Sequence, residues 1–255
     1  MKIGAQMYTV RDYCKTPDSF SDTLARLSDM GFKYVQVSGT CPYEGEWLKE
    51  KLKENGLKCV ITHSSLQEMT EDIESLIAKH KVFGCDFIGL GWPGNRKEKP
   101  FDQVIEELRP VIKAIKNSGL HFSYHNHSDE FFKYNGKTEM ERLLEEFDKD
   151  ELSFTLDTYW VQAAGADPIQ WLKRLKGRVQ CIHLKDIELY IDNNGRELRY
   201  APVGSGNMNF EGILQASDEA GSQYGLIEQD DCYGKNPFEC LSESLKYLRA
   251  LGYND

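Results

Sequence analysis

The stretch HFSYHNHSDEFF, residues 121–132, holds three of the six histidines of the chain together with two carboxylates. Imidazole and carboxylate groups are the ligands that divalent metals take and the groups that move protons in acid–base catalysis. Three more ionisable residues stand inside apolar runs: Asp157 in FTLDTYW, His183 in CIHLKD and Glu228 in LIEQDD. Burial of such a group is costly unless it is paired or binds a metal, so these residues predict a shared chemical site.

Short runs of strand-forming residues alternate with helical patterns along the whole chain. The runs cover residues 2–8, 34–39, 58–64, 87–92, 121–126, 153–160, 179–186 and 225–231. Between them apolar residues recur three and four positions apart, for example in 21–32, 101–120 and 237–253, which is the pattern of an amphipathic helix. Pro110 predicts a kink in the second of these helices.

The alternation of strand and helix predicts a parallel sheet, and eight such units in about 250 residues are typical of the (β/α)8 TIM barrel. A doubly wound open sheet is the alternative α/β fold, but MYTVRDYC stands where its G-x-G-x-x-G motif would follow the first strand. The chain has no Gly/Ser-rich linker and no low-complexity segment. The sequence therefore predicts one α/β TIM-barrel domain over residues 1–255.

The composition favours an enzyme that acts on small molecules. The net charge of −10 and the pI near 5.2 argue against a nucleic-acid partner, which needs clustered excess Lys and Arg. No apolar stretch approaches the roughly 18 residues of a membrane span, and the first residues lack the apolar core of a signal peptide. Seven cysteines without a C-x-x-C pair argue against a disulfide framework and indicate a reducing, cytoplasmic setting.

In a TIM barrel the chemistry collects at the carboxyl ends of the strands, and unusual polar residues are predicted there in this chain. They are Gln6, Tyr8, Arg11, Gln36, His63, Trp92, His125, Asn126, His127, Asp157, His183, Lys185, Asp186, Glu228, Gln229, Asp230 and Asp231. An Asp after a strand is often the N-cap of the next helix, and a single His is often a packing residue. Asp157, His183 and Glu228, however, come from consecutive strands and could converge on one ion, such as Mn²⁺, Mg²⁺, Co²⁺, Fe²⁺ or Zn²⁺.

Five segments, HNHSDEF, LDTYWVQAAGADP, IHLKD, PVGSGNMNF and IEQDD, resemble the sugar phosphate isomerase/epimerase family, the xylose isomerase-like TIM barrels. The similarity runs from AQMYTVRD in the first strand to IEQDD in the last. It implies one divalent metal held by a Glu, an Asp, a His and a Glu on strands five to eight, and Asp157, His183 and Glu228 match the last three positions. Where ketose epimerases have Glu-Asn-His, this chain has HNH at residues 125–127, which is nearer to inosose dehydratases and enzymes of 3-keto sugars.

The sequence leaves the fourth metal ligand open between His125, which keeps the strand position, and Glu130, which could reach back from the following loop. Glu130 is slightly favoured because a carboxylate would preserve the charge of the ligand set. The substitution by His125 also removes one of the two glutamates that serve ketose epimerases as acid and base on opposite faces of the substrate. A substitute catalytic pair could use His127, Glu130 or Lys185 against Glu228.

The resemblance implies a metal-dependent enzyme that removes the proton α to the carbonyl of a small keto sugar or polyol. Return of that proton elsewhere makes an isomerase or epimerase, which is the function we expect first. Loss of the β-hydroxyl makes a dehydratase of the inosose or 3-keto-sugar type, which is the alternative. An AP endonuclease-like enzyme would need three zinc ions and a basic face, and a non-catalytic sugar-binding subunit is a further option. Relatives often form homo-oligomers, so the resemblance offers that assembly as well.

Five residues are candidates for contact with the substrate. His63 matches a histidine that many relatives place near the substrate. Trp92 and Tyr159 could stack on a sugar ring or simply belong to the core. Arg11 could contact an anionic group or lie in solvent, and Gln229 stands at the end of the last strand.

Lys185 and the segment that follows it have several interpretations. Lys185 could bind an oxyanion, act as a base if burial lowers its pKa, or form a salt bridge with Asp186. The amides of GSG, residues 204–206, could cradle a phosphate, or the segment could be a plain turn. Residues 187–204 form a long loop in which NNG predicts a hairpin turn, and such a loop could shape the pocket or act as a lid.

Overall fold

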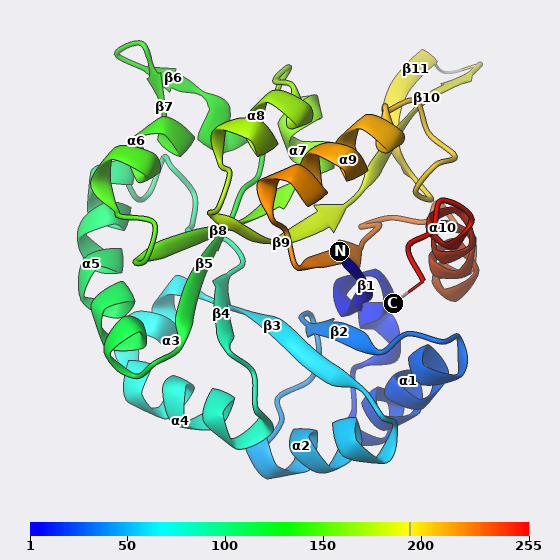
Figure 1. Cartoon of the computed structure of the whole chain (residues 1–255), viewed down its shortest axis with the longest axis horizontal. Helices are drawn as coiled ribbons and strands as arrows, with labels where there is room; N and C mark the ends of the chain where they lie inside the picture. Colours follow the sequence, from blue (N-terminus) through cyan, green and yellow to red (C-terminus); the bar gives the residue numbers. More distant parts are fainter. Residues whose placement is uncertain (194, 255) are drawn as a thin grey trace.

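The computed structural model describes residues 1–193 and 195–254, and eight strands in it close into a barrel (Figure 1). Around the barrel their order is β1, β12, β9, β8, β5, β4, β3 and β2, and all neighbouring pairs run parallel. The bounds are β1 Lys2–Gln6, β2 Tyr34–Val37, β3 Lys58–Ser64, β4 Phe87–Leu90, β5 His121–His125, β8 Leu152–Asp157, β9 Val179–Leu184 and β12 Tyr224–Ile227. The TIM barrel predicted from the sequence is therefore confirmed.

Helices lie around the outside of the barrel (Figure 1). Their bounds are α1 Pro17–Asp29, α2 Gly45–Glu54, α3 Leu66–Glu71, α4 Ile73–Phe83, α5 Phe101–Asn117, α6 Glu139–Glu146, α7 Thr158–Ala163, α8 Pro168–Arg174, α9 Phe210–Ala220 and α10 Pro237–Ala250, with 3-10 helices at η1 Met7–Tyr13 and η2 Asp129–Phe131. In α5, Val104, Leu108, Val111 and Ile115 recur at helical spacing and are buried, which fixes the face turned to the core. The helix is continuous across Pro110, the position at which the sequence predicts a kink.

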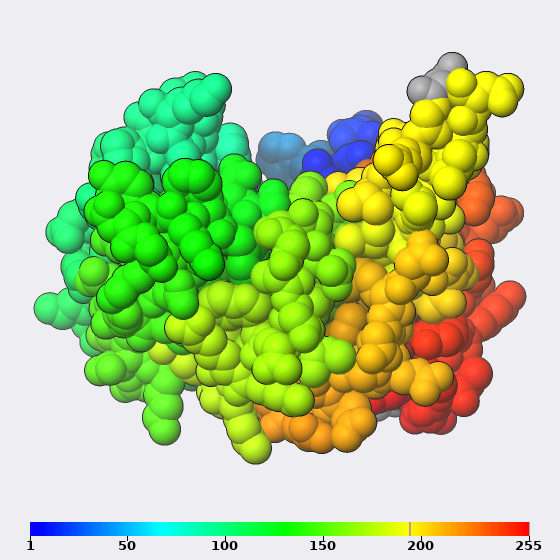
Figure 2. Space-filling view, turned by 90° about the horizontal axis from the view of Figure 1, so that it is seen from above, coloured from blue at the N-terminus to red at the C-terminus, as the bar shows by residue number. Residues whose placement is uncertain are grey.

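Two short antiparallel ribbons stand outside the barrel. One pairs β6 Lys133–Tyr134 with β7 Lys137–Thr138, and the other pairs β10 Asp186–Asp192 with β11 Gly195–Ala201. The second ribbon, yellow in Figure 2, projects from the body of the molecule. It is the predicted hairpin of the long loop, although the middle residue of NNG, Asn194, lies outside the described residues. Within the described part of the chain, no helix is long and apolar enough to cross a membrane.

The inside of the barrel changes from apolar to polar toward the carboxyl ends of the strands. Side chains two residues apart on one strand point to the same face, so the same face of β9 carries both Cys181 and His183. Cys181 and Leu226 belong to a cluster of buried apolar side chains. Two residues further along their strands stand His183 and Glu228. The polar groups at the barrel mouth therefore rest on an apolar floor.

His80 on α4 is a buried histidine that makes the stability of the fold depend on pH. Its ring is buried, and its Nδ1–H donates to Leu76 O at 2.7 Å, so its Nε2 accepts from Thr62 Oγ1 at 2.7 Å. Burial lowers the pKa of His80 to about 4, whereas an unfolded His titrates near pH 6.5. Between these values the unfolded chain binds more protons. The free energy of unfolding therefore falls as the pH drops from 6.5 toward 4, by about 3 kcal/mol from this residue.

We expect the His80→Gln variant to lose less stability than the wild type between neutral pH and pH about 4, because Gln has no proton to take up. Urea unfolding at the two pH values measures the difference. His121→Gln replaces an exposed histidine and is the matched control, which should follow the wild type. Equal losses in the His80 variant and the wild type would contradict this account of acid stability.

Candidate active site

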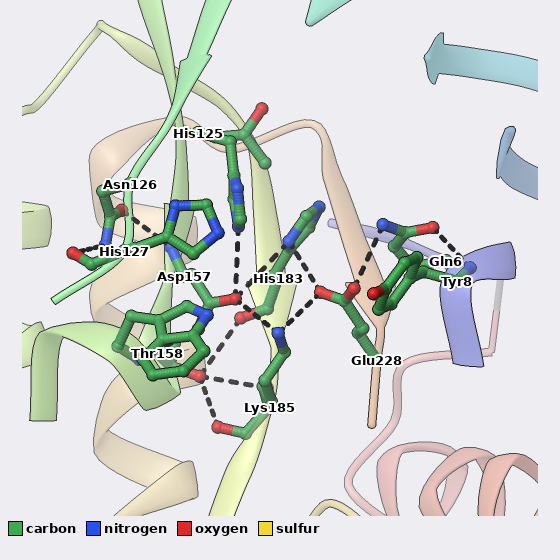
Figure 3. Close-up of polar contacts among 12 residues, drawn as sticks. Gln6, Tyr8, His125, Asn126, His127, Asp157, Thr158, His183, Lys185 and Glu228 are labelled. Atoms are coloured by element: carbon green, nitrogen blue, oxygen red, sulfur yellow. Dashed lines mark hydrogen bonds and ion pairs between the residues drawn. The ribbon is translucent and has the colours of Figure 1, made fainter. Parts of the chain in front are cut away.

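Four buried side chains meet at the carboxyl-terminal mouth of the barrel (Figure 3). They are His125 and Asp157 at the ends of β5 and β8, His183 near the end of β9, and Glu228 directly after β12. One ligand atom from each lies within 4.8 Å of the others. Two imidazoles and two carboxylates are a ligand set that a divalent transition metal takes. Of the two candidates for the fourth position, the structure brings His125 to this group.

The ring of His183 is held so that one nitrogen faces the other ligand atoms of the group. Its Nε2 donates to Gln36 Oε1 at 2.8 Å, which is the carbonyl–histidine arrangement found around metal ligands. Its Nδ1 lies 2.9 Å from Glu228 Oε2 and 3.6 Å from Asp157 Oδ2. In the metal-free protein Nδ1 and Oε2 pair with each other, and Oε2 also lies 3.0 Å from the ammonium of Lys185. Both atoms also belong to the group of ligand atoms within 4.8 Å of one another, which fits a bound cation in place of the proton.

His125 and Asp157 are arranged in the same way. The Nδ1–H of His125 donates to Gly91 O at 3.1 Å, so its Nε2, 3.3 Å from Asp157 Oδ2, keeps a free lone pair. Burial lowers the pKa of His125, which favours the neutral ring that a metal needs. Asp157 uses its other oxygen, Oδ1, to accept from Trp160 N at 3.0 Å and cap α7. The N-cap interpretation and the ligand interpretation of Asp157 therefore apply to different oxygens.

The charges of the cluster depend on one another. Burial raises the pKa of Asp157 and Glu228, but Lys185 and the imidazoles outweigh it and hold both pKa values below their ordinary range. Burial lowers the pKa of His183, but Glu228 and Asp157 outweigh it and raise that pKa to about 9. Without a cation in place, His183 therefore carries a proton that a metal must displace.

We expect the affinity for Mn²⁺ or Co²⁺ to rise about tenfold per pH unit below pH 9 and to level off above it, because binding releases one proton from His183. Calorimetric titration at neutral pH, in buffers that differ in ionisation enthalpy, counts the protons released per ion. If no proton is released, or if the affinity does not depend on pH, metal binding does not displace a proton from His183.

Lys185 places a buried ammonium inside this cluster. Its Nζ lies 3.0 Å from Asp157 Oδ2, 3.0 Å from Glu228 Oε2 and 2.9 Å from Asp230 Oδ1. Burial lowers the pKa of Lys185, but the three carboxylates outweigh it and raise the pKa well above its ordinary value. Lys185 is thus a fixed cation rather than a base. Its partners do not include Asp186, which the sequence suggested.

Glu130 lies outside the metal-ligand group. Its Oε1 accepts from Tyr124 Oη at 2.9 Å and pairs with Arg96 at 3.3 Å. Its Oε2 accepts from the backbone N–H of His127 at 2.7 Å. The expectation that Glu130 reaches back to the metal is corrected, because its oxygens are engaged in this separate network. Glu130 instead fixes the loop that carries His127.

His127 stands in the wall of the cavity next to the cluster. Its ring meets that of His125 edge to face, with 4.6 Å between centroids, and lies 5.6 Å from the ring of Trp160. Its Nδ1 is buried without a hydrogen-bond partner among the described residues. Burial lowers the pKa of His127 to about 3, so the ring is neutral.

A cavity of about 460 Å³ is lined by two of the metal-ligand candidates, His125 and Glu228, and its lining also includes His63, His127, Trp92 and Trp160. Of the predicted substrate contacts, His63 and Trp92 thus face the cavity, and Trp92 is 54% exposed at its mouth. The ring nitrogen Nε2 of His63 is buried and has no hydrogen-bond partner in the described chain.

The other three predicted contacts do not line this cavity. The ring of Tyr159 packs on Tyr200, with 4.2 Å between centroids, because the helical turn at α7 directs Trp160 to the cavity instead. The guanidinium of Arg11 lies 4.3 Å from the ring of Tyr8, in a neighbouring hollow. The side chain of Gln229 donates to a backbone carbonyl of its own loop.

Sequence reasoning did not assign roles to Gln36, Asp230 and Trp160. Gln36 and Asp230 stand at strand ends, where the barrel fold predicts functional residues. Only the structure shows that Gln36 pairs with His183 and that Asp230 pairs with Lys185. Trp160 follows Asp157 by three residues, so the two side chains lie on the same face of a helix that begins directly after the strand. Recognition of that helix in the sequence would have indicated Trp160 as a residue of the site.

The fold and the site can be set beside known proteins. A family model described as xylose isomerase-like TIM barrel matches residues 24–251. An inosose dehydratase of Geobacillus thermodenitrificans is 23% identical over 91% of this chain and 89% of that protein. A solved sugar phosphate isomerase/epimerase from Parabacteroides distasonis has a TM-score of 0.82 at 22% identity, covering 100% of this chain and 95% of that one. A probable 3-DHS dehydratase from Bacillus anthracis has a TM-score of 0.76 at 18% identity, covering 98% and 99%.

Proposed function

This chain belongs to the xylose isomerase-like TIM barrel family, and we propose that it is a divalent-metal-dependent enzyme that removes the proton α to the carbonyl of a keto sugar or polyol. The family resemblance expected from the sequence is confirmed. The observation that carries the function is the group His125, Asp157, His183 and Glu228, with ligand atoms within 4.8 Å at the barrel mouth. Bound there, a divalent ion would supply Lewis-acid polarisation of a ketone oxygen and a neighbouring hydroxyl.

The protein's own groups supply the proton chemistry from two sides of the cavity (Figure 3). Glu228 and Lys185 directly follow β12 and β9, and His127 comes from the loop after β5. Glu228 stays ionised and can take the α proton, while its Oε1 accepts from Gln6 Nε2 at 3.1 Å, which fixes the carboxylate. The ammonium of Lys185 can donate to an oxygen that gains negative charge. His127 can hold a substrate hydroxyl from the opposite wall.

Within this chemistry we propose dehydration, in which loss of the β-hydroxyl as water follows removal of the α proton. The resemblance assigns epimerases two carboxylates on opposite faces of the substrate, but here His125 is an imidazole and Glu130 is engaged elsewhere. Lys185 keeps its proton and can stabilise charge on a leaving hydroxyl, and the proton that Glu228 takes from the α carbon can depart with that hydroxyl as water. The names of the inosose and 3-DHS dehydratases support this choice, and that of the Parabacteroides protein keeps an isomerase or epimerase as the second candidate.

The experiment compares metal-stripped protein with protein reloaded with Mn²⁺, Co²⁺, Mg²⁺ or Zn²⁺, on inososes, 3-keto sugars and ketoses in D₂O. A dehydratase forms an unsaturated ketone, seen by ultraviolet absorbance, with loss of one water by mass. An isomerase or epimerase keeps all oxygens and takes deuterium at the α carbon. If the metal-stripped protein turns over its substrate as fast as the reloaded protein, the metal-dependent mechanism is refuted.

An AP endonuclease-like function has less support than a metal-dependent sugar enzyme. In the described part of the chain, His, Cys, Asp and Glu side chains form one group that could hold a metal, which fits one ion better than the three zinc ions of an AP endonuclease-like site. The net charge of −10 also disfavours a nucleic-acid partner. A small-molecule sugar is therefore the partner that we propose.

A further inference from the structure

The segment that returns from the β10–β11 ribbon wraps its backbone around the carboxylate of Asp186. Gly204 N and Gly206 N donate to Asp186 Oδ2 at 3.0 and 3.1 Å. Met208 N and Ile187 N donate to Oδ1 at 3.3 and 2.8 Å. A Cβ on Gly206 would stand 2.5 Å from Asp186 Oδ1, so this close approach requires glycine.

This cradle lies where TIM barrels commonly bind phosphate, in the loops that follow the seventh and eighth strands. The barrel strand before it, β9, is the seventh along the chain. Backbone N–H groups that converge in this way form an anion site. Here the anion is a side chain of the protein itself, so the GSG segment has no free amides to offer a substrate phosphate through this cradle.

The cavity also offers no excess positive charge. Among its described lining residues, Lys185 is the one Lys or Arg, and its ammonium already pairs with three carboxylates. The two charges of a bound divalent ion would be matched by Asp157 and Glu228, which leaves Lys185 matched by Asp230.

The remaining walls suit a neutral polyhydroxy molecule. Tyr8, Trp92 and Trp160 provide ring faces for the C–H surface of a sugar. Ser38 provides a hydroxyl that can both donate and accept hydrogen bonds, whereas the hydroxyl of Ser65 already caps α3 through Glu68. A phosphate dianion in the same cavity would lose its water and face carboxylates without an unpaired cation, which is strongly unfavourable.

We propose that the substrate of this site is an uncharged polyhydroxy ketone and that the enzyme discriminates against phosphorylated sugars. The inference rests on the proposed function, because it names the substrate class of the same site. The cations that could oppose it lie in the neighbouring hollow of about 310 Å³, where Arg11 and Lys235 stand with Asp12, Asp230 and Asp231. That hollow holds more carboxylates than cations.

The test measures binding apart from turnover. Protein loaded with Mn²⁺ is titrated with D-fructose, with D-fructose 6-phosphate and with inorganic phosphate, and water-proton relaxation reports access to the ion. We expect the ketose to bind about 100-fold more tightly than its phosphate ester, the effect of placing like charges together. Equal or tighter binding of the ester, or displacement of the ketose by inorganic phosphate, would overturn the proposal.

Two variants locate any ester that does bind. If Arg11→Gln or Lys235→Gln abolishes a preference for the ester, the neighbouring hollow is a phosphate subsite and the proposal is wrong. If neither change alters a preference for the neutral ketose, the proposal is supported. Failure of the proposed function would give a different result. A protein that binds the ketose more tightly than the ester but converts no ketone would contradict the proposed reaction and leave the proposed substrate class intact.

Discussion

Replacement of Glu228 by Gln is expected to lower kcat by about 10²–10⁴-fold, the range for loss of a positioned proton-transfer group. Gln has the shape of Glu but neither takes up a proton at neutral pH nor neutralises a cation. The change also removes one of the carboxylates that raise the pKa of His183, and weakens binding of the divalent ion. Activity should therefore be measured with the metal at saturation, so that the loss in kcat is separated from the loss of metal.

Glu50→Gln is the matched control, because it makes the same change on the exposed face of α2. It should keep wild-type activity and metal affinity. Wild-type turnover by metal-saturated Glu228→Gln protein would contradict the assignment of Glu228 as the group that takes the proton. If the protein were a non-catalytic sugar-binding subunit, both variants would retain sugar binding, and no ketone would be converted by the wild type.

Replacement of Lys185 by Met is expected to destabilise the metal-free protein by about 3–5 kcal/mol, the usual cost of removing one partner from a buried ionic group. The side chain is 1% exposed, and its loss leaves Asp157, Glu228 and Asp230 close together without their ammonium. The carboxylates can relieve the repulsion by taking up a proton, so the loss should be smaller at acid pH. Urea unfolding of the metal-free protein measures the effect.

The same variant separates the ammonium from the metal. Mn²⁺ or Co²⁺ should recover part of the lost stability, because the ion supplies positive charge to the same carboxylates. Lys116→Met, which breaks the exposed pair with Asp150, is the control and should change stability little. A Lys185 variant as stable as the wild type without metal would show that the carboxylates do not depend on this cation.

The sequence by itself determined the barrel and three of its four metal-ligand candidates. Strands and helices alternate through the chain, and consecutive barrel strands are neighbours, so Asp157, His183 and Glu228 had to meet. The two-residue period of a strand also set their direction, since His183 and Glu228 continue the faces of the buried Cys181 and Leu226. None of this depends on contacts between distant loops, which is why local pattern was enough.

Only the tertiary structure decided the groups whose positions depend on loops. The choice of His125 over Glu130 follows from Arg96, a residue of another loop, which pairs with Glu130 and holds it away from the cluster. Trp160 replaces Tyr159 at the cavity because α7 begins directly after β8, and a helix turns side chains by a different period from a strand.

The sequence allowed two interpretations of HFSYHNHSDEFF and two of GSG, because in both segments the partner of a loop residue could not be predicted. In the first, His125 is fixed by the strand it ends, whereas Glu130 is fixed by side chains that approach from elsewhere. In the second, Gly204 and Gly206 lie 18 and 20 residues after Asp186, and the β10–β11 ribbon folds them back onto its carboxylate. Periodicity specifies the face of a strand or helix, but the partner of a loop residue is set by which chain segment packs beside it.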